Sequence, residues 1–567
     1  MNILIPDSWL REHLKTKTTT KQIGQYLSLC SQSVEKIIKK DNDFVYNIEI
    51  TANRPDCLSV YGLARELSAI LPRFGFKAHL LPIKDSKIDI PKVKNGLPLT
   101  VRIKDQSLCS RFTAIIFDEI KVKISPKIVR DRLERAGLRA LNNVVDISNY
   151  LMLELGQPMH TFDYDKIKDA KVILRQSAGG EKITTLDGQV RPLPDGAIII
   201  EDGQGRIIDL CGIMGGANSQ VDQNTKRVLL FVQVYNPMEI RQTCQKMAFR
   251  TEAASRFEKG IDSEGVLPAM KNAVTMFKKL ANAKIAGNLI DIYPHPPKPH
   301  HVSLTQVKLN QIMGIELKLA KAARILESLG FRIKLNARHY TLEAVVPHWR
   351  HSDITIPEDL IEEVTRIYGY HNLPNLLPKG QIPLRIKEAN FSWEKRAKEA
   401  LKFWGLTEVA SYSMVSEKLL TKTKFIPQEH LKISNPLTQD RVYMRTSLLP
   451  SLLEIFDQNQ AHQKKIKIFE LANIYLPQGR NKLPQETTIL AGILAGDNFY
   501  SSKGLVEAIL AEMGIKQIVF EAYTLEKTPY GKIFQKGQSA EVTVKNHSLG
   551  IVGQIKQTIL KQFNIKG

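Results

Sequence analysis

The stretch Val346–Pro374, VPHWRHSDITIPEDLIEEVTRIYGYHNLP, predicts one well-delimited helix. Thr355 and Glu358 have the spacing of a capping box, in which each residue's side chain bonds the backbone N–H of the other. Pro357 stands where a first-turn proline is tolerated, because its missing N–H would have no partner inside the helix. These signals predict a helix over about 356–368.

Four carboxylates gather around the start of this helix. Three recur at i, i+3 and i+4, which predicts that they share one face, and the fourth lies on the incoming loop. Two interpretations remain: a solvated acidic face helped by the helix dipole, or a set of the oxygen ligands that magnesium prefers. The carboxylates are Asp353, Asp359, Glu362 and Glu363. The opposite, apolar stripe comprises Leu360, Ile361, Val364 and Ile367.

The length and charge of the chain set bounds on its class. A chain of 567 residues predicts about four domains at roughly 150 residues each, and 43% hydrophobic residues suffice for several cores. The formal net charge of +22 favours a polyanionic partner, with a charge kept for solubility as the alternative.

Targeting and redox signals are weak. The sequence has no run of about 18 apolar residues, and MNILIPDSWLREHL has no basic region followed by an apolar core. We therefore expect a cytoplasmic protein with no membrane partner. The cysteines are odd in number and form no C-x-x-C pair, so neither a disulfide framework nor a thiolate zinc site is indicated.

Three strings of the opening stretch, WRHSDI, DLIEEVTRIYGY and NLP, resemble the fifth domain of bacterial-type phenylalanine–tRNA ligase beta subunits. In that family an Asp, a second Asp six residues on, and a Glu-Glu pair nine and ten residues on contact magnesium shared with the alpha subunit. The same four positions here are Asp353, Asp359, Glu362 and Glu363. The resemblance therefore implies Mg2+ as a cofactor.

The resemblance extends to the N-terminal region, 1–85, where the residues predict two short helices, a strand over about 31–38 and a helix from about Leu58 after a turn at 53–56. The family carries an oligonucleotide-binding barrel between the two halves of this domain. Only the residues from Lys39 to Phe44 separate them here, so we expect this barrel to be absent.

Region 86–292 resembles the paired third and fourth domains of the family, which house a hydrolytic editing site. The matching strings are GLRALNNVVDISNYLMLELGQPMHTFDYDKI (137–167), IIIEDGQGRIIDLCGIMGGANSQV (198–221) and FRTEAASRFEKGID (249–262). His160 is a candidate general base or ligand, although a histidine between Met159 and Phe162 is more often structural. Gly215 suits a close backbone approach, with a plain turn as the alternative.

The editing positions depart from the family pattern. Editing-competent relatives read LLESAYFDP, in which the glutamate recognises the hydroxyl of a misattached tyrosine, and this chain reads LLFVQVYNP at 229–237. The glutamate position is therefore Phe231, with Gln233 as an alternative acceptor. We expect a degenerate editing pocket retained for shape and tRNA docking. Its positions are Ser148, His160, Cys211, Gly215, Phe231 and Ala253.

The last two predicted domains are 303–376, with helix and strand patterns, and 388–567. In the latter, NPLTQD, RTSLLPSLL and IFELANIYLP resemble a core that copies the class II synthetase fold without a working active site. A predominantly antiparallel sheet with covering helices is expected, and no P-loop or catalytic-triad spacing is present. Arg445 is a candidate anchor, with a cap or surface charge as the alternative. The family continues past this point with a further strand and an anticodon-binding domain, so we expect an incomplete sequence or a reduced subunit.

Together these features predict a multidomain α+β protein: a small N-terminal α/β domain, a mixed editing-type pair, a small helix–strand domain and a class II-like core without catalytic motifs. The resemblance implies an alpha subunit that binds ATP and phenylalanine, an alpha-two beta-two heterotetramer, and tRNA. The alternative function is a free-standing aminoacyl-tRNA deacylase or tRNA-binding scaffold.

Overall fold

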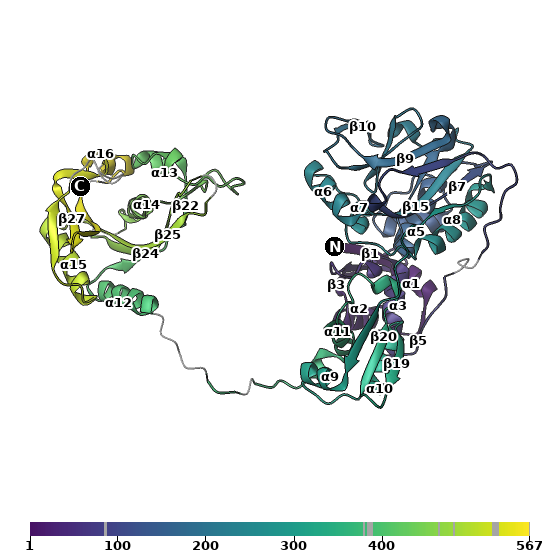
Figure 1. The fold of residues 1–567 in the computed structure, drawn as a ribbon, viewed down its shortest axis with the longest axis horizontal. Coiled ribbons are helices and arrows are strands. Elements are labelled where there is room, and N and C mark those ends of the chain that lie inside the picture. The colour runs from purple at the N-terminus through teal and green to yellow at the C-terminus, as the bar shows by residue number, and fades with distance from the viewer. Residues whose placement is uncertain are drawn as a thin grey trace. The chain divides into compact units, whose positions relative to one another are not determined.

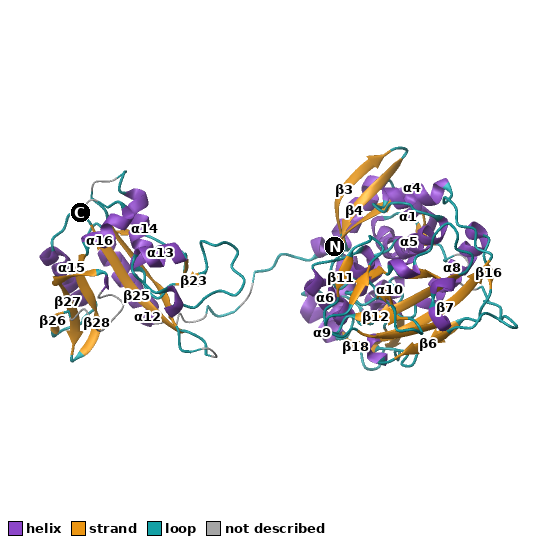
Figure 2. Cartoon of the chain, turned by 90° about the horizontal axis from the view of Figure 1, so that it is seen from above, coloured by secondary structure: helices purple, strands orange, loops and turns teal. Residues whose placement is uncertain are grey.

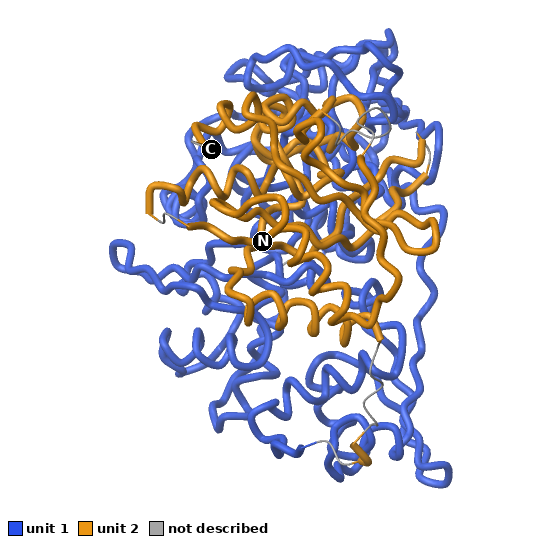
Figure 3. Tube along the Cα trace, turned by 90° about the vertical axis from the view of Figure 1, so that its left-hand side faces the viewer, with its two compact units in different colours: residues 1–377 blue, residues 378–567 orange. Residues whose placement is uncertain are grey.

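The structure is a computed structural model that describes residues 1–83, 88–377, 380–382, 389–462, 465–479, 482–523 and 532–565. The chain forms two compact units, Met1–Leu377 and Pro378–Gly567 (Figure 3). The predicted domain boundaries at residues 85–86 and 388 lie outside the described residues. Each unit contains both helices and antiparallel strands, so the chain is a multidomain α+β protein as predicted.

The first unit begins with an antiparallel sheet in the order β1-β4-β3; α1 and α2 pack on this sheet, and α3 packs on these two helices. The caps of α2 and α3 are Thr19 and Ser59. The expected strand and helix are present, although they begin about two residues later than predicted. Strands β3 and β4 form a long hairpin (Figure 2), and a turn at Asp41–Asn42 joins them. The elements are β1 (Asn2–Pro6), α1 (Asp7–His13), β2 (Leu14–Thr16), α2 (Thr20–Cys30), β3 (Ser33–Lys40), β4 (Asp43–Glu49), α3 (Val60–Ile70) and β5 (Ala78–Leu80).

Two five-stranded sheets follow, one in the order β14-β13-β12-β9-β6 and one in the order β16-β7-β15-β8, with β17 beside β7 (Figure 1). Every residue of β15 is buried, and its sequence VLLFVQVY is apolar except for Gln233 and the hydroxyl of Tyr235. The strands are β6 (Thr100–Ile103), β7 (Cys109–Asp118), β8 (Met159–Asp163), β9 (Lys171–Gln176), β10 (Lys182–Thr184), β11 (Val190–Pro192), β12 (Ile198–Glu201), β13 (Ile207–Leu210), β14 (Met214–Gly215), β15 (Val228–Tyr235), β16 (Lys284–Ile285) and β17 (Ile290–Ile292). The helices are α4 (Lys127–Arg135), α5 (Asn143–Leu155), α6 (Pro237–Met247), α7 (Glu252–Phe257) and α8 (Val266–Ala281).

The last part of the first unit is a three-stranded sheet, β18-β20-β19, with three helices packed on it. The apolar stripe predicted for α11 is buried, and it belongs to the same continuous core as Ile3 and Ile5. The regions predicted as separate domains within 1–376 therefore share one core. The elements are β18 (His301–Thr305), α9 (Gln306–Met313), α10 (Leu319–Ser328), β19 (Arg332–Asn336), β20 (Thr341–Val345) and α11 (Pro357–Tyr368).

The second unit matches the predicted antiparallel pattern, except that β21 pairs with β24 in parallel. None of its described helices, and none in the first unit, is long and apolar enough to cross a membrane. The strands are β21 (Thr407–Glu408), β22 (Met414–Val415), β23 (Tyr443–Met444), β24 (Lys467–Leu476), β25 (Gln485–Leu494), β26 (Ile518–Ala522), β27 (Phe534–Val544) and β28 (His547–Ile555). The helices are α12 (Ala389–Phe403), α13 (Glu417–Lys422), α14 (Leu449–Asn459), α15 (Phe499–Glu512) and α16 (Gln557–Leu560).

Candidate metal and editing sites

The start of α11 differs from the predicted capping box. The helix begins at Pro357, so Ile356 is the N-cap residue and the third helical position is Asp359. The Asp359 carboxylate accepts the backbone N–H groups of Thr355 at 2.7 Å and Ile356 at 2.9 Å. The capping box between Thr355 and Glu358 is therefore wrong by one residue, because the proline fixes where the helix begins. Glu358 instead forms an ion pair with a lysine of α9.

The three helical carboxylates predicted to share one face, Asp359, Glu362 and Glu363, do not do so. Glu363 is 2% exposed and its carboxylate is bonded by the guanidinium groups of Arg350 and Arg366. Asp353 accepts from Arg350 Nε at 3.0 Å and from Nη2 at 2.9 Å. Glu362 is exposed, and no ion pair engages it within the described part of the chain. A turn of about 100° per residue separates the two glutamates, which places one inside and the other outside.

The donor set therefore fits a magnesium ion only in part. Glu362 is open to a hydrated ion, and Asp359 is half-buried with a carboxylate directed at its own helix start. Asp353 and Glu363 are already neutralised by arginines. A metal held by this segment would thus have one or two carboxylate ligands. Mg2+ bound by so few protein ligands keeps water molecules, or takes ligands from another molecule, at its remaining coordination positions.

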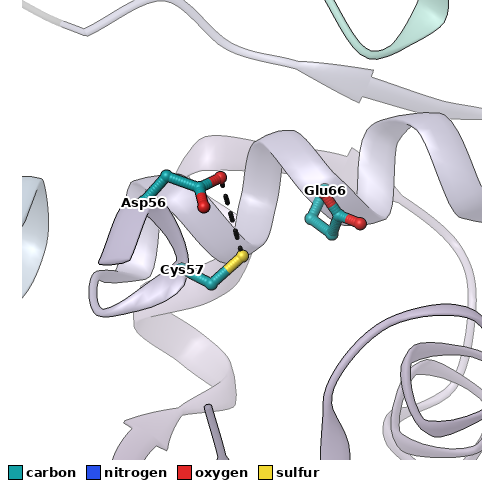
Figure 4. A group of neighbouring side chains, drawn as sticks. All are labelled: Asp56, Cys57 and Glu66. Carbon is teal, nitrogen blue, oxygen red and sulfur yellow. Dashed lines mark hydrogen bonds between the residues drawn. The ribbon is translucent and has the colours of Figure 1, made fainter. Parts of the chain in front are cut away.

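A different group of ligating side chains lies deeper in the unit. Among the described residues, Asp56, Cys57 and Glu66 alone place three such atoms within reach of one ion (Figure 4). Arg54 already fills this position: its Nε donates to Asp56 at 2.9 Å, and its Nη2 donates to Cys57 Sγ at 3.2 Å and to Glu66 at 2.8 Å. Burial opposes ionisation here, yet Arg366 and Arg54 lower the pKa of Glu66 to about 2. The group is an internal ion-pair centre, in which a guanidinium takes the place of a metal.

The sequence analysis did not predict this centre. Arg366, which bonds Glu66, also pairs with Glu363 at a spacing of i, i+3, and this ion-pair signal was present in the string EEVTR. Glu66 had no such signal, because its partner Arg366 lies 300 residues along the chain.

Three of the predicted editing positions come together. Phe231 on β15 lies opposite His160 on β8, and their rings are 5.7 Å apart. A Cβ added at Gly215 would overlap the His160 ring, so only glycine fits there. Burial lowers the pKa of His160 to about 4, so the imidazole is neutral near pH 7. Phe231 is itself fully buried, and its ring centroid is 4.9 Å from that of Phe162.

The other three positions are not joined to this group by any hydrogen bond or ring contact between described residues. Ser148 lies in α5, where its hydroxyl donates to the carbonyl oxygen of Val145 at 2.7 Å. Cys211 follows β13 and is fully buried, and burial together with Asp209 raises the pKa of its thiol. Ala253 is half-buried in α7.

The contacts of two further residues bear on alternatives left open by the sequence: Gln233 as a replacement acceptor, and Arg445 as an anchor, a cap or a surface charge. Gln233 lies on the same face of β15 as Phe231 and is buried, and its carbonyl oxygen has no hydrogen-bond donor among the described residues. Arg445 is neither a cap nor a surface charge. It is buried, pairs with Glu470 at 3.2 Å and donates to the carbonyl oxygen of Asn473 at 2.9 Å, which makes it an anchor inside the second unit.

Comparison with known families accounts for most of the chain. Residues 108–282 match the B3/4 domain, residues 302–370 match the tRNA synthetase B5 domain, and residues 373–567 match the phenylalanyl-tRNA synthetase beta chain CLM domain. The N-terminal fragment of the phenylalanyl-tRNA synthetase beta subunit from Pyrococcus horikoshii is a distant structural match. It has a TM-score of 0.37 and 15% identity, over 65% of this chain and 100% of that one.

Curated relatives align along nearly the whole chain. The phenylalanine–tRNA ligase beta subunit of Carboxydothermus hydrogenoformans is 34% identical over 552 residues, which cover 94% of this chain and 67% of the relative. The beta subunit of Geobacter metallireducens is 34% identical over 541 residues, covering 92% of this chain and 66% of the relative. This chain therefore spans about two thirds of the length of these relatives. With this identity sustained across its sequence, the chain belongs to the family of phenylalanine–tRNA ligase beta subunits.

Proposed function

We propose that this chain is the non-catalytic subunit of a ligase that attaches phenylalanine to its tRNA at the expense of ATP. An alpha subunit would bind the ATP and the phenylalanine, and two pairs of chains would form a heterotetramer. The observation that carries this proposal is the alignment of 94% of the chain with a beta subunit at 34% identity. The matches of residues 302–370 to the tRNA synthetase B5 domain and of residues 373–567 to the phenylalanyl-tRNA synthetase beta chain CLM domain support it.

The test is phenylalanine-dependent exchange of pyrophosphate into ATP. The purified chain alone should show none, and the chain mixed with an alpha subunit of a relative or of its own source should show exchange. Exchange by the chain alone would refute the assignment. Failure to co-purify with any alpha subunit, while the chain hydrolyses aminoacyl-tRNA by itself, would favour the free-standing deacylase.

The magnesium ion is the second element of the proposal. Glu362 and the half-buried Asp359 are the carboxylates available to the ion. Water molecules retained by the ion and ligands from the partner chain would complete its coordination. The ion would supply positive charge that braces the junction between the two subunits. Glu362 would face the ion, while Asp359 keeps the start of α11 in place.

Impaired tyrosine editing is the third element. A site that selects tyrosine through its hydroxyl needs a hydrogen-bond acceptor, and Phe231 provides none. Its ring is surrounded by Phe112, Phe162 and His160, whose centroids lie 4.9–5.7 Å away. Leaving a buried hydroxyl without a partner costs about 1–3 kcal/mol, which removes most of the discrimination. We infer a domain retained for its shape and for docking tRNA.

A further inference from the structure

A continuous series of ion pairs runs through the interior of the first unit. It alternates arginines with carboxylates, four of each, and so carries no net charge. Its members come from two segments that are far apart in sequence, 54–66 and 350–366. We call this series the charge ladder, and in order it comprises Asp353, Arg350, Glu363, Arg366, Glu66, Arg54, Asp56 and Arg65.

The middle of the charge ladder joins two helices. Arg366 of α11 bonds Glu363 of its own helix and Glu66 of α3. On one side Arg350 reaches Glu363 at 2.8 Å, and on the other side Arg54 reaches Glu66 at 2.8 Å. The position of α11 against α3 is therefore set by charged contacts as well as by the apolar stripe.

The two ends of the charge ladder approach each other. The Arg65 guanidinium bonds Asp56 at 3.4 Å and also lies 4.2 Å from the centre of the Trp349 ring. Trp349 directly precedes Arg350 in the chain, so the series closes on itself through one peptide bond. Removing one carboxylate from the interior of the series leaves a buried excess of positive charge that the remaining partners compensate only in part, which is destabilising.

The carboxylate of Glu363 has no acceptor position left for a metal. Its Oε1 accepts from Arg350 Nη2 and Arg366 Nε, and its Oε2 accepts from Arg350 Nη1 and Arg366 Nη2. An ionised carboxylate has about four acceptor sites, and all of them are used. A magnesium ion at Glu363 would have to displace a guanidinium and would lie beside two positive charges.

We propose that Asp353 and Glu363 are positioning residues that hold α11 against α3 through arginines, and that they do not bind magnesium. Only Glu362 and Asp359 then remain for the metal in this segment. The inference rests on the proposed function solely for the presence of that metal. The division of the four carboxylates into two pairs rests on the contacts of the charge ladder.

The neighbouring glutamates provide a matched pair of variants for the test. Glu363→Gln removes one charge from the charge ladder, whereas Glu362→Gln removes the same charge one residue away on the exposed side of the helix. Thermal unfolding of the full chain is followed for each, with EDTA and with millimolar magnesium. We expect Glu363→Gln to lower the unfolding temperature by about 5 °C in both conditions and Glu362→Gln to leave it unchanged.

A double-mutant cycle separates the charge ladder from general loss of stability. Glu66→Gln and Glu363→Gln each leave Arg366 one carboxylate partner, whereas the double variant leaves this buried guanidinium none, so their combined effect should be larger than the sum of the two. Glu66→Gln combined with Glu362→Gln should be additive. If Glu363→Gln yields no folded protein, Asp353→Asn at the end of the charge ladder takes its place in the comparison with Glu362→Gln, with EDTA and with magnesium.

The inference is overturned if magnesium stabilises the unmodified chain and Glu362→Gln and Glu363→Gln abolish that stabilisation equally. Additivity of Glu66→Gln with Glu363→Gln would also overturn it. Assembly of the unmodified chain with an alpha subunit is measured separately. If the chain does not assemble while the double-mutant cycle gives the expected coupling, the proposed function is refuted and the inference about the charge ladder stands.

Discussion

Replacing Asp209 by asparagine isolates the effect of one buried carboxyl group on stability. Asp209 lies on β13, is 3% exposed and forms no ion pair with any described residue. Burial raises its pKa to about 8, although the Cys211 thiol opposes the shift. Near pH 7 the group is therefore mainly protonated in the folded chain and ionised in the unfolded chain.

The magnitude follows from this difference in proton binding. A carboxyl group with a raised pKa contributes stability that is fully present below about pH 4 and is lost as the pH rises towards 8. Within this window the loss is roughly 1.4 kcal/mol per pH unit. Asparagine has nearly the same shape and no charge. As the pH rises from 5 to 7, the free energy of unfolding of the Asp209→Asn variant should therefore increase by roughly 2–3 kcal/mol relative to that of the unmodified chain.

Urea unfolding of both proteins at several pH values is the assay, and Asp202→Asn is the matched control. Asp202 is also buried and follows β12 in the same sheet, but hydrogen bonds from Arg206 and from backbone N–H groups outweigh its burial and lower its pKa. Its substitution should therefore reduce stability by a constant amount from pH 5 to pH 7. Parallel stability curves for Asp209→Asn and the unmodified chain would refute the reasoning.

Three further outcomes are expected. The assembled enzyme should hydrolyse tyrosyl-tRNA slowly and the Phe231→Glu variant should do so faster; rapid clearance by the unmodified enzyme would contradict impaired editing. Glu362→Ala should weaken assembly with the alpha subunit in a magnesium titration while the beta chain keeps its unfolding temperature, and unchanged assembly would exclude a bridging ion at this residue. Because the net charge is +22, tRNA affinity should fall steeply with salt, whereas a flat plot of log affinity against log salt would count against phosphate contacts.

Local patterns in the sequence were sufficient to predict some elements of the fold. The stripe Leu360, Ile361, Val364 and Ile367 is buried as its spacing predicts, because helical periodicity is a property of neighbouring residues. The strand and helix around 33–70 were also expected within about two residues. The start of α11 was predicted less accurately: Thr355 has the side chain of an N-cap residue, but the helix begins at Pro357 and places Ile356, which has no capping oxygen, at the N-cap.

The candidate sites depended on contacts that no local pattern contains. Glu362 and Glu363 are adjacent and chemically identical, and what distinguishes them is an arginine network completed by Glu66. In the region that matches the B3/4 domain, the pairing of β15 with β8 decides that Phe231 faces His160. Neither fact can be obtained from spacing, because each joins segments that are far apart along the chain.

The hairpin of β3 and β4 is a place in the sheet where an inserted segment would leave the strand pairing unchanged. The two strands remain paired up to Lys40 and Asp43, so the chain leaves and re-enters the sheet at neighbouring points. Any segment whose own ends lie close together can occupy that position, and a two-residue turn is its shortest form. The pairing of β3 with β4 would be the same with any of these segments between them. The hairpin is thus a natural junction for modular exchange, and a place where a folded tag can be inserted while the core of the unit stays intact.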